Sequence, residues 1–102
     1  MVEKIGESEF KEVLGEGTIV VDFSATWCGP CKMLAPVMEE LSEEIGDVNF
    51  YNIDVDENQD LAMEYGVRSI PAVLVFKGND KVAETVGFMP KQQMADFINN
   101  NK

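Results

Sequence analysis

The sequence contains no histidine, one tryptophan and only two cysteines, at positions 28 and 31. A structural zinc site needs four nitrogen or sulfur ligands, so these two thiols cannot complete one within a single chain. A zinc or iron–sulfur site could form only between chains. We therefore expect no bound metal.

Basic residues and long apolar runs are also scarce. Eight lysines and arginines against 19 aspartates and glutamates give a net charge of −11, which repels phosphate backbones and anionic membrane surfaces. No run approaches the roughly 20 apolar residues of a membrane helix, and the start Met1-Val2-Glu3-Lys4 does not resemble a secretory leader. We expect a cytoplasmic protein with neither a nucleic acid nor a membrane as partner.

The composition is that of one globular domain. The 102 residues are 45% hydrophobic and 26% charged, and the chain has no repeat, low-complexity tract or flexible linker. We predict a single domain over residues 1–102, and a monomer.

Two apolar segments predict a strand–helix–strand unit. Residues 18–24 are β-branched and apolar without alternation, which is typical of a central strand covered on both faces, and residues 48–55 indicate a second strand. Between them, an apolar stripe at helical spacing predicts a helix from the cysteines to about Gly46. The stripe consists of Leu34, Val37, Met38, Leu41 and Ile45. Such alternation implies parallel strands joined by crossover helices.

Shorter elements complete an α/β fold. Ser8 and Asn58 are expected to cap two short helices, and residues 72–76 and 81–86 to form an antiparallel hairpin. Pro90 suits the first turn of a last helix, and Met94, Phe97 and Ile98 are expected to face the core from it. The sum is a central mixed sheet of about five strands flanked by about four helices, on both faces.

The only two thiols lie in the motif Trp27-Cys28-Gly29-Pro30-Cys31, directly after the predicted central strand. Residues three apart on a helix share a face, so Cys28 would cap the first turn with Cys31 behind it, which favours a reversible disulfide. The roughly half positive charge of a helix N-terminus stabilises a thiolate. A purely structural crosslink of so short a loop would contribute only about 2 kcal/mol. A redox role is therefore favoured over inert buried thiols.

Asp22 places a carboxyl group within the predicted central strand. If that strand is buried, desolvation raises the pKa of Asp22 towards neutrality, and the carboxylate could accept the proton that Cys31 must lose. The alternative is an aspartate near a strand end that points to solvent.

The run Val21-Asp22-Phe23-Ser24-Ala25-Thr26-Trp27-Cys28-Gly29-Pro30-Cys31-Lys32 resembles the thioredoxin family of small dithiol reductases. The resemblance extends over nearly the whole chain. It includes Pro36, the run Asp54-Val55-Asp56-Glu57-Asn58, the pair Ile70-Pro71, and Gly87.

The resemblance implies a thioredoxin fold and a protein-disulfide reductase of the cytoplasm, with roles in electron transport and cell redox homeostasis. Its clients would be proteins with disulfides, and a thioredoxin reductase, either NADPH- and flavin-dependent or ferredoxin-linked, would regenerate it. No cofactor is expected beyond the Cys28–Cys31 disulfide. The alternative is a binding subunit that uses the same fold without its thiols.

The resemblance also implies residue roles. Cys28 would be the nucleophile, Cys31 the resolving thiol and Asp22 the proton acceptor, while Gly29 and Pro30 tune the redox potential. Asn52 stands where many members carry a lysine, so we expect Asp22 to titrate high.

The remaining implied residues form a docking surface for clients. Pro71 would follow a cis peptide bond and face the dithiol, although from the residues alone a trans proline opening a strand is favoured. Trp27, Ile70, Gly87 and Phe88 would surround Cys28. Their alternative role is packing.

Overall fold

The computed structural model describes all residues, 1–102, and contains one five-stranded mixed sheet with the strand order β1-β3-β2-β4-β5. The strands are β1 (Val2–Lys4), β2 (Thr18–Ser24), β3 (Asn49–Asp54), β4 (Ala72–Lys77) and β5 (Asp80–Val86). The helices are α1 (Glu7–Val13), α2 (Gly29–Glu44), α3 (Gln59–Glu64) and α4 (Lys91–Asn101). The predicted α/β fold is confirmed.

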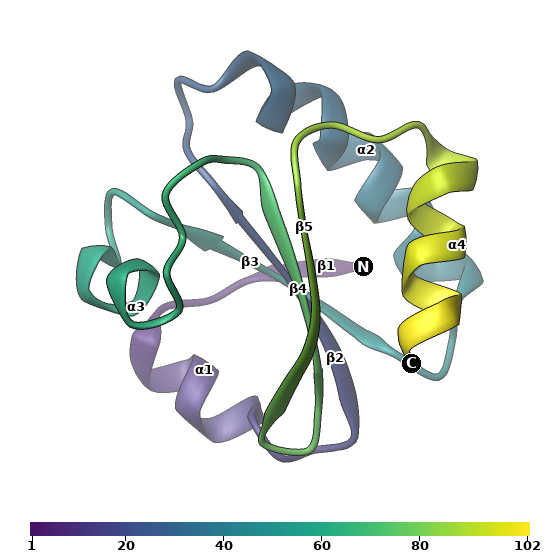
Figure 1. Ribbon diagram of the computed structural model, residues 1–102, viewed down its shortest axis with the longest axis horizontal. Helices are drawn as coiled ribbons and strands as arrows, with labels where there is room; N and C mark the ends of the chain where they lie inside the picture. Colours follow the sequence, from purple (N-terminus) through teal and green to yellow (C-terminus); the bar gives the residue numbers. More distant parts are fainter.

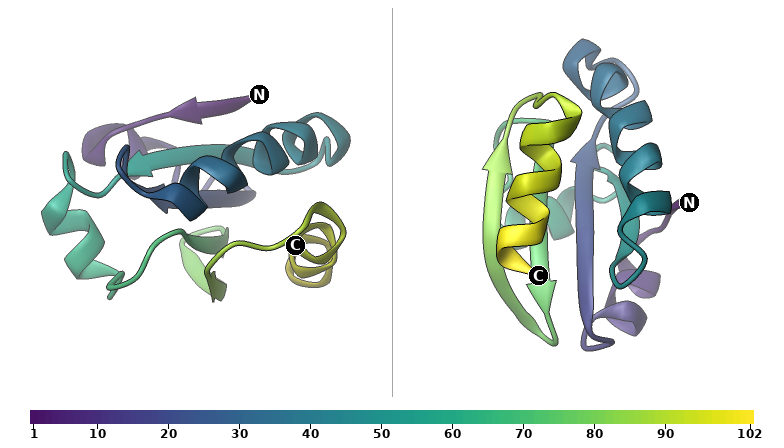
Figure 2. Two further views of the ribbon diagram at one scale, coloured as in Figure 1. Left: turned by 90° about the horizontal axis from the view of Figure 1, so that it is seen from above. Right: turned by 90° about the vertical axis from the view of Figure 1, so that its right-hand side faces the viewer.

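The central position of β2 follows from its apolar, β-branched sequence. β2 pairs in parallel with β3 and antiparallel with β4, and the predicted hairpin of β4 and β5 is antiparallel. Helices α1 and α3 cover one face of the sheet, and α2 and α4 cover the other (Figure 1). Seen from the side, α2 and α4 lie next to each other over their face (Figure 2). β2 is therefore buried on both sides.

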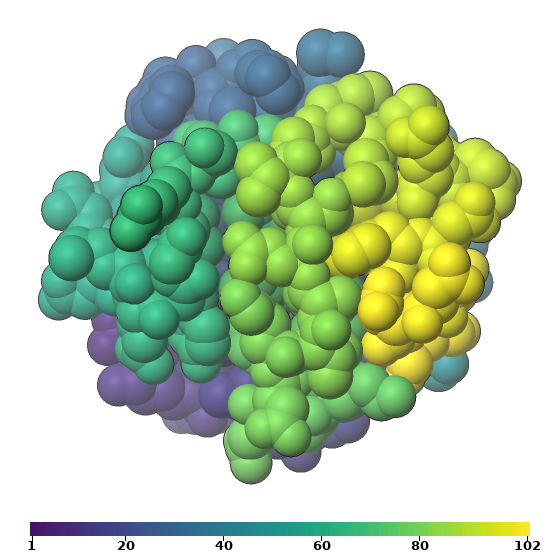
Figure 3. Space-filling view, viewed as in Figure 1, coloured from purple at the N-terminus to yellow at the C-terminus, as the bar shows by residue number.

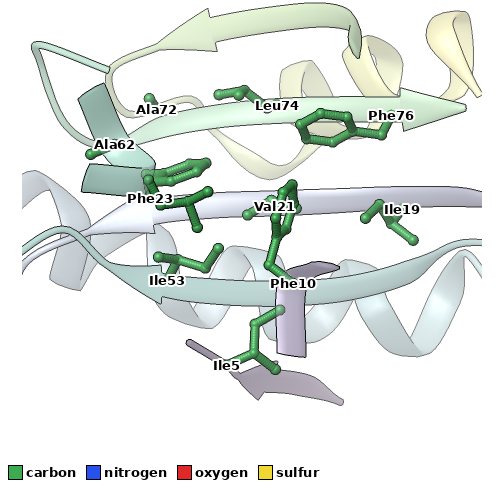
Figure 4. Packing of buried hydrophobic residues seen from close by; sticks show 11 residues of the cluster. Ile5, Phe10, Ile19, Val21, Phe23, Ile53, Ala62, Ala72, Leu74 and Phe76 are labelled. Atoms are coloured by element: carbon green, nitrogen blue, oxygen red, sulfur yellow. The ribbon is translucent and has the colours of Figure 1, made fainter. Parts of the chain in front are cut away.

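Each face of the sheet has its own apolar core. On the α1 and α3 face, Phe10, Tyr65 and Phe76 contact one another edge to face, with ring centroids 5.4–5.6 Å apart. Figure 4 shows part of this core, with Phe10 reaching the sheet from α1. On the opposite face, the predicted stripe of α2 packs with residues of α4. The fully or nearly buried members are Leu34, Met38, Leu41, Ile45, Met94 and Ile98, while Val37 and Phe97 are half-buried.

Two predicted helix starts are wrong in detail. Helix α1 begins at Glu7 with Gly6 as its N-cap, two residues before Ser8, because the Gly6 N–H donates to Glu9 Oε1 at 2.9 Å. Pro90 precedes α4 instead of lying in its first turn, since its extended ψ of 158° makes it the N-cap. Asn58 does precede α3, but its amide donates to the Asp54 carbonyl and makes no side-chain cap.

The structure adds β1, a three-residue edge strand that pairs in parallel with β3 and that the sequence did not indicate. None of the four helices combines the length and apolar content needed to cross a membrane.

Candidate functional site

The two cysteines form a disulfide at the junction of β2 and α2. Cys28 is the N-cap of α2, and its Sγ accepts a hydrogen bond from the Cys31 N–H at 3.2 Å. Gly29 and Pro30 occupy the first two helical positions, where backbone N–H groups have no intrahelical partner, so proline costs no hydrogen bond there. The chain therefore presents both sulfurs to a helix N-terminus.

The sulfurs have similar exposure but different surroundings. Cys28 and Cys31 are only 5% and 4% exposed, so exposure does not single out an outer thiol in the disulfide form. Cys28 Sγ lies 3.9 Å from the carbonyl oxygen of Ile70. Cys31, by contrast, lines a cavity of about 270 Å³ together with Asp22. The Cys28 sulfur therefore lies next to Ile70, whereas Cys31 lies next to the Asp22 cavity.

Asp22 is buried in the middle of β2, as its place in the apolar run predicted, and is 3% exposed. Its Oδ1 atom has no hydrogen-bond partner. Burial raises the pKa of Asp22 to about 7, and a smaller contribution from the Asn52 side chain opposes the shift. Asn52 Nδ2 donates to the Asp22 carbonyl at 3.0 Å and to Ser24 Oγ at 2.8 Å. A carboxyl group poised near neutrality therefore shares a cavity with Cys31.

The predicted docking surface consists of Trp27, Ile70, Pro71, Gly87 and Phe88. The Ile70–Pro71 peptide bond is cis, and the Gly87 N–H donates to the Pro71 carbonyl at 2.8 Å. Trp27 and Phe88 are 69% and 38% exposed, Ile70 and Gly87 are half-buried, and Pro71 is buried. In the space-filling view, the blue segment at the start of α2 lies beside the green segment that precedes β4 (Figure 3). The contact of Cys28 with Ile70 and the hydrogen bond between Gly87 and Pro71 hold residues 70, 71 and 87 next to the disulfide.

Three residues near the site were not assigned to it from the sequence. The Trp27 Nε1–H donates to Asp56 Oδ2 at 2.8 Å, which fixes the exposed indole. Lys4 and Lys32 both line the Asp22 cavity. Lys32 is a direct neighbour of Cys31 in sequence, but Lys4 reaches the cavity only through the pairing of β1 with β3, for which the sequence gives no local signal.

Comparison with known proteins agrees with this site. The thioredoxin family model matches residues 1–100. The chain is 46% identical over 101 residues to thioredoxin of Bacillus subtilis, covering 98% of this chain and 97% of the relative. It is 42% identical over 100 residues to thioredoxin of Listeria monocytogenes, covering 97% of each. The crystal structure of thioredoxin from Malassezia sympodialis matches with a TM-score of 0.90 at 38% identity, covering 99% of this chain and 90% of that one.

These matches cover nearly the whole chain, and the chain carries its redox-active cysteine pair on the same fold as these relatives. Neither the site nor the matches support the alternative of a binding subunit that does not use its thiols. The activity is that of a thiol–disulfide oxidoreductase that reduces protein disulfides through Cys28 and Cys31. The chain belongs to the thioredoxin family.

Proposed function

We propose that Cys28 is the nucleophile of this reductase and that Cys31 is the resolving thiol. The support is their placement: Cys28 Sγ adjoins Ile70 on the docking surface, whereas Cys31 lies against the Asp22 cavity. A client disulfide approaching over the docking surface meets Cys28 first. The N-terminus of α2 and the Cys31 N–H stabilise the Cys28 thiolate.

The reaction proceeds in two exchanges. The Cys28 thiolate attacks one client sulfur, the client S–S bond breaks, and the second client sulfur leaves as a thiolate that takes a proton from water. Cys31 then loses its proton and attacks Cys28 Sγ. The mixed disulfide breaks, the first client sulfur leaves as a thiolate that also takes a proton from water, and the Cys28–Cys31 disulfide forms. The client gains two electrons and two protons, and the reductase is oxidised.

Asp22 accepts the Cys31 proton in this scheme. The observation that carries the assignment is the cavity that Asp22 and Cys31 both line, together with the buried Asp22 Oδ1 atom, which has no hydrogen-bond partner. A general base works best when its pKa is close to the working pH, and burial raises the pKa of Asp22 to about 7.

The docking surface binds clients in an extended conformation. Backbone pairing tolerates many sequences, and the exposed Trp27 and Phe88 add apolar contacts that are equally tolerant. Gly29 and Pro30 set the thiol potential through the first turn of α2.

A thioredoxin reductase, flavin- or ferredoxin-linked, returns two electrons to the disulfide, and the protein works as a cytoplasmic monomer of one domain without a further cofactor. The family relationship supports a thioredoxin reductase as the electron donor, since dithiol reductases of this kind depend on a dedicated reductase. Electron transport and redox homeostasis follow from that cycle.

Separate serine variants test the two thiol roles. Cys28→Ser should abolish insulin reduction, because no thiolate remains to open the client disulfide, whereas Cys31→Ser should accumulate a mixed disulfide that mass spectrometry detects. Normal turnover by either variant contradicts the scheme. A binding subunit would be favoured instead by two results together: the wild type does not reduce insulin, and the chain with both cysteines replaced by serine still binds clients.

A further inference from the structure

The cavity beside Cys31 has a cation at its rim that the scheme above does not use. Lys4 of β1 lines it together with Asp22 and Cys31. At about 270 Å³ the cavity has room for several water molecules, each of which needs roughly 30 Å³ in the liquid. Charges that face such a space act on Asp22 directly or through one water.

Strand register places Lys4 in one row with Asp22. Lys4 pairs with Asn52, and Asn52 pairs with Asp22, so the three side chains project from the same face of the sheet. Val2 and Phe50, two pairs earlier and therefore on the same face, lie on the α2 side, which fixes the side for the whole row. Neighbouring strands are about 4.8 Å apart, so two steps separate the Lys4 and Asp22 backbones by about 10 Å. The lysine stem and the carboxyl group together span that distance.

Few other groups can stabilise an ionised Asp22. Asn52 lies between the two charges but is neutral, and its amide already donates to a carbonyl and a hydroxyl. β4 places the apolar Val73 opposite Asp22. The remaining cavity groups that carry or can carry a charge are Asp54 of β3 and Cys31 and Lys32 of α2. Lys32 follows the buried Cys31 on the helix and is exposed, outside the row.

The only ion pair of Lys4 is an exposed one. Its Nζ is 3.1 Å from Glu57 Oε1, and the two side chains are 59% and 62% exposed. Exposed pairs of this kind hold their members weakly. We infer that Lys4 is a positioning residue for the Cys31 proton transfer: its ammonium group exchanges between Glu57 at the surface and the ionised Asp22 carboxylate in the cavity.

This inference rests on the proposed role of Asp22 and extends it. A nearby cation favours the charged form of a carboxyl group and so opposes the desolvation that keeps Asp22 protonated. Lys4 thereby maintains a fraction of ionised Asp22 at neutral pH, ready to take the Cys31 proton.

The direct test is an NMR titration of the Asp22 carboxyl carbon in reduced protein. Lys4→Met should raise the Asp22 pKa by about half a unit or more, and Lys4→Arg, which keeps the charge, should restore the wild-type value. Lys11→Met, which removes an exposed lysine of α1, is the matched control and should leave it unchanged. An unchanged pKa in Lys4→Met, or an equal rise in Lys32→Met, overturns the assignment.

The kinetic test follows the release of a client from its mixed disulfide across pH. Half a unit of pKa lowers the ionised fraction of Asp22 about twofold to threefold below neutrality and hardly at all above about pH 9, so Lys4→Met should slow release only at low pH. In an Asp22→Asn background, Lys4→Met should have no effect. Slowing in that background overturns the inference. If Asp22→Asn alone left release unchanged, the proton-acceptor role would fail, while the NMR titration would still report on the Lys4 coupling.

Discussion

At the scale of single residues, Asp22 makes the stability of the fold depend on pH. Its pKa rises from an ordinary 3.8 to about 7 because burial penalises the charged form. As pH rises through this window, the unfolded chain releases the Asp22 proton while the folded chain retains it. The folded state therefore loses stability between pH 3.8 and about pH 7, and no more above that, by about 4 kcal/mol in total.

Replacing the carboxyl group by an amide should remove this dependence. We expect Asp22→Asn to match the wild type near pH 4 and to be about 4 kcal/mol more stable at pH 8, because an amide of the same shape carries no charge to desolvate. Urea unfolding of both oxidised proteins at pH 4, 6 and 8 measures the difference. A stability difference that did not change with pH would show that Asp22 is not the source.

At the scale of elements, the parts that could be predicted are those with strong local patterns. The limits of β2 are those predicted, residues 18–24, because a continuous apolar, β-branched run has no competing interpretation. The helix after the cysteines ends at Glu44, two residues before the predicted Gly46, since an apolar stripe specifies a face better than an end. The burial of Asp22 followed from the strand that carries it.

What could not be predicted depends on contacts distant in sequence. β1 has three residues and no periodicity, and it is held by pairing with β3 and by the Val2 N–H, which donates to Glu39 Oε2 at 3.1 Å. The position of Lys4 in one row with Asn52 and Asp22 exists only through that pairing. Similarly, the free oxygen of Asp22 and its cavity arise where α2 packs on the sheet, so the sequence alone indicates the carboxyl group but not the space around it.

Helix α1 depends on a single buried residue. Phe10 is its only fully covered side chain and contacts the rings of Tyr65 and Phe76. We predict that Phe10→Ala lowers the free energy of unfolding by about 3–5 kcal/mol, because it leaves a cavity between α1 and the sheet, while the folded fraction still reduces insulin. Chemical denaturation measures the loss, and Phe10→Leu should lose much less. A small loss for alanine would mean that other contacts anchor α1.

At the scale of the whole molecule, the fold brings the reactive groups to one end of the strands of the sheet. The carboxyl end of β2 leads directly into the N-terminus of α2, and the cis bond before β4 and the glycine after β5 meet there. Open α/β sheets generally bind their ligands at such strand ends. The short docking surface sits on a chain that otherwise carries a charge of −11, so most of the molecule repels anions.

That charge should select among small disulfide substrates by electrostatics alone. We expect the reduced protein to react with cystamine, a dication at neutral pH, faster than with the dianion dithiodiglycolate, and the ratio of the two rate constants to fall about tenfold or more as ionic strength rises from about 0.01 M to 1 M. The physical reason is screening, because the Debye length shrinks from about 30 Å to about 3 Å over that range. Comparing the salt dependence, instead of the rates themselves, removes intrinsic differences between the two disulfides. Neutral bis(2-hydroxyethyl) disulfide is the control and should react at a nearly constant rate; a ratio that salt left unchanged would mean that the charge is screened from the dithiol by its own surroundings.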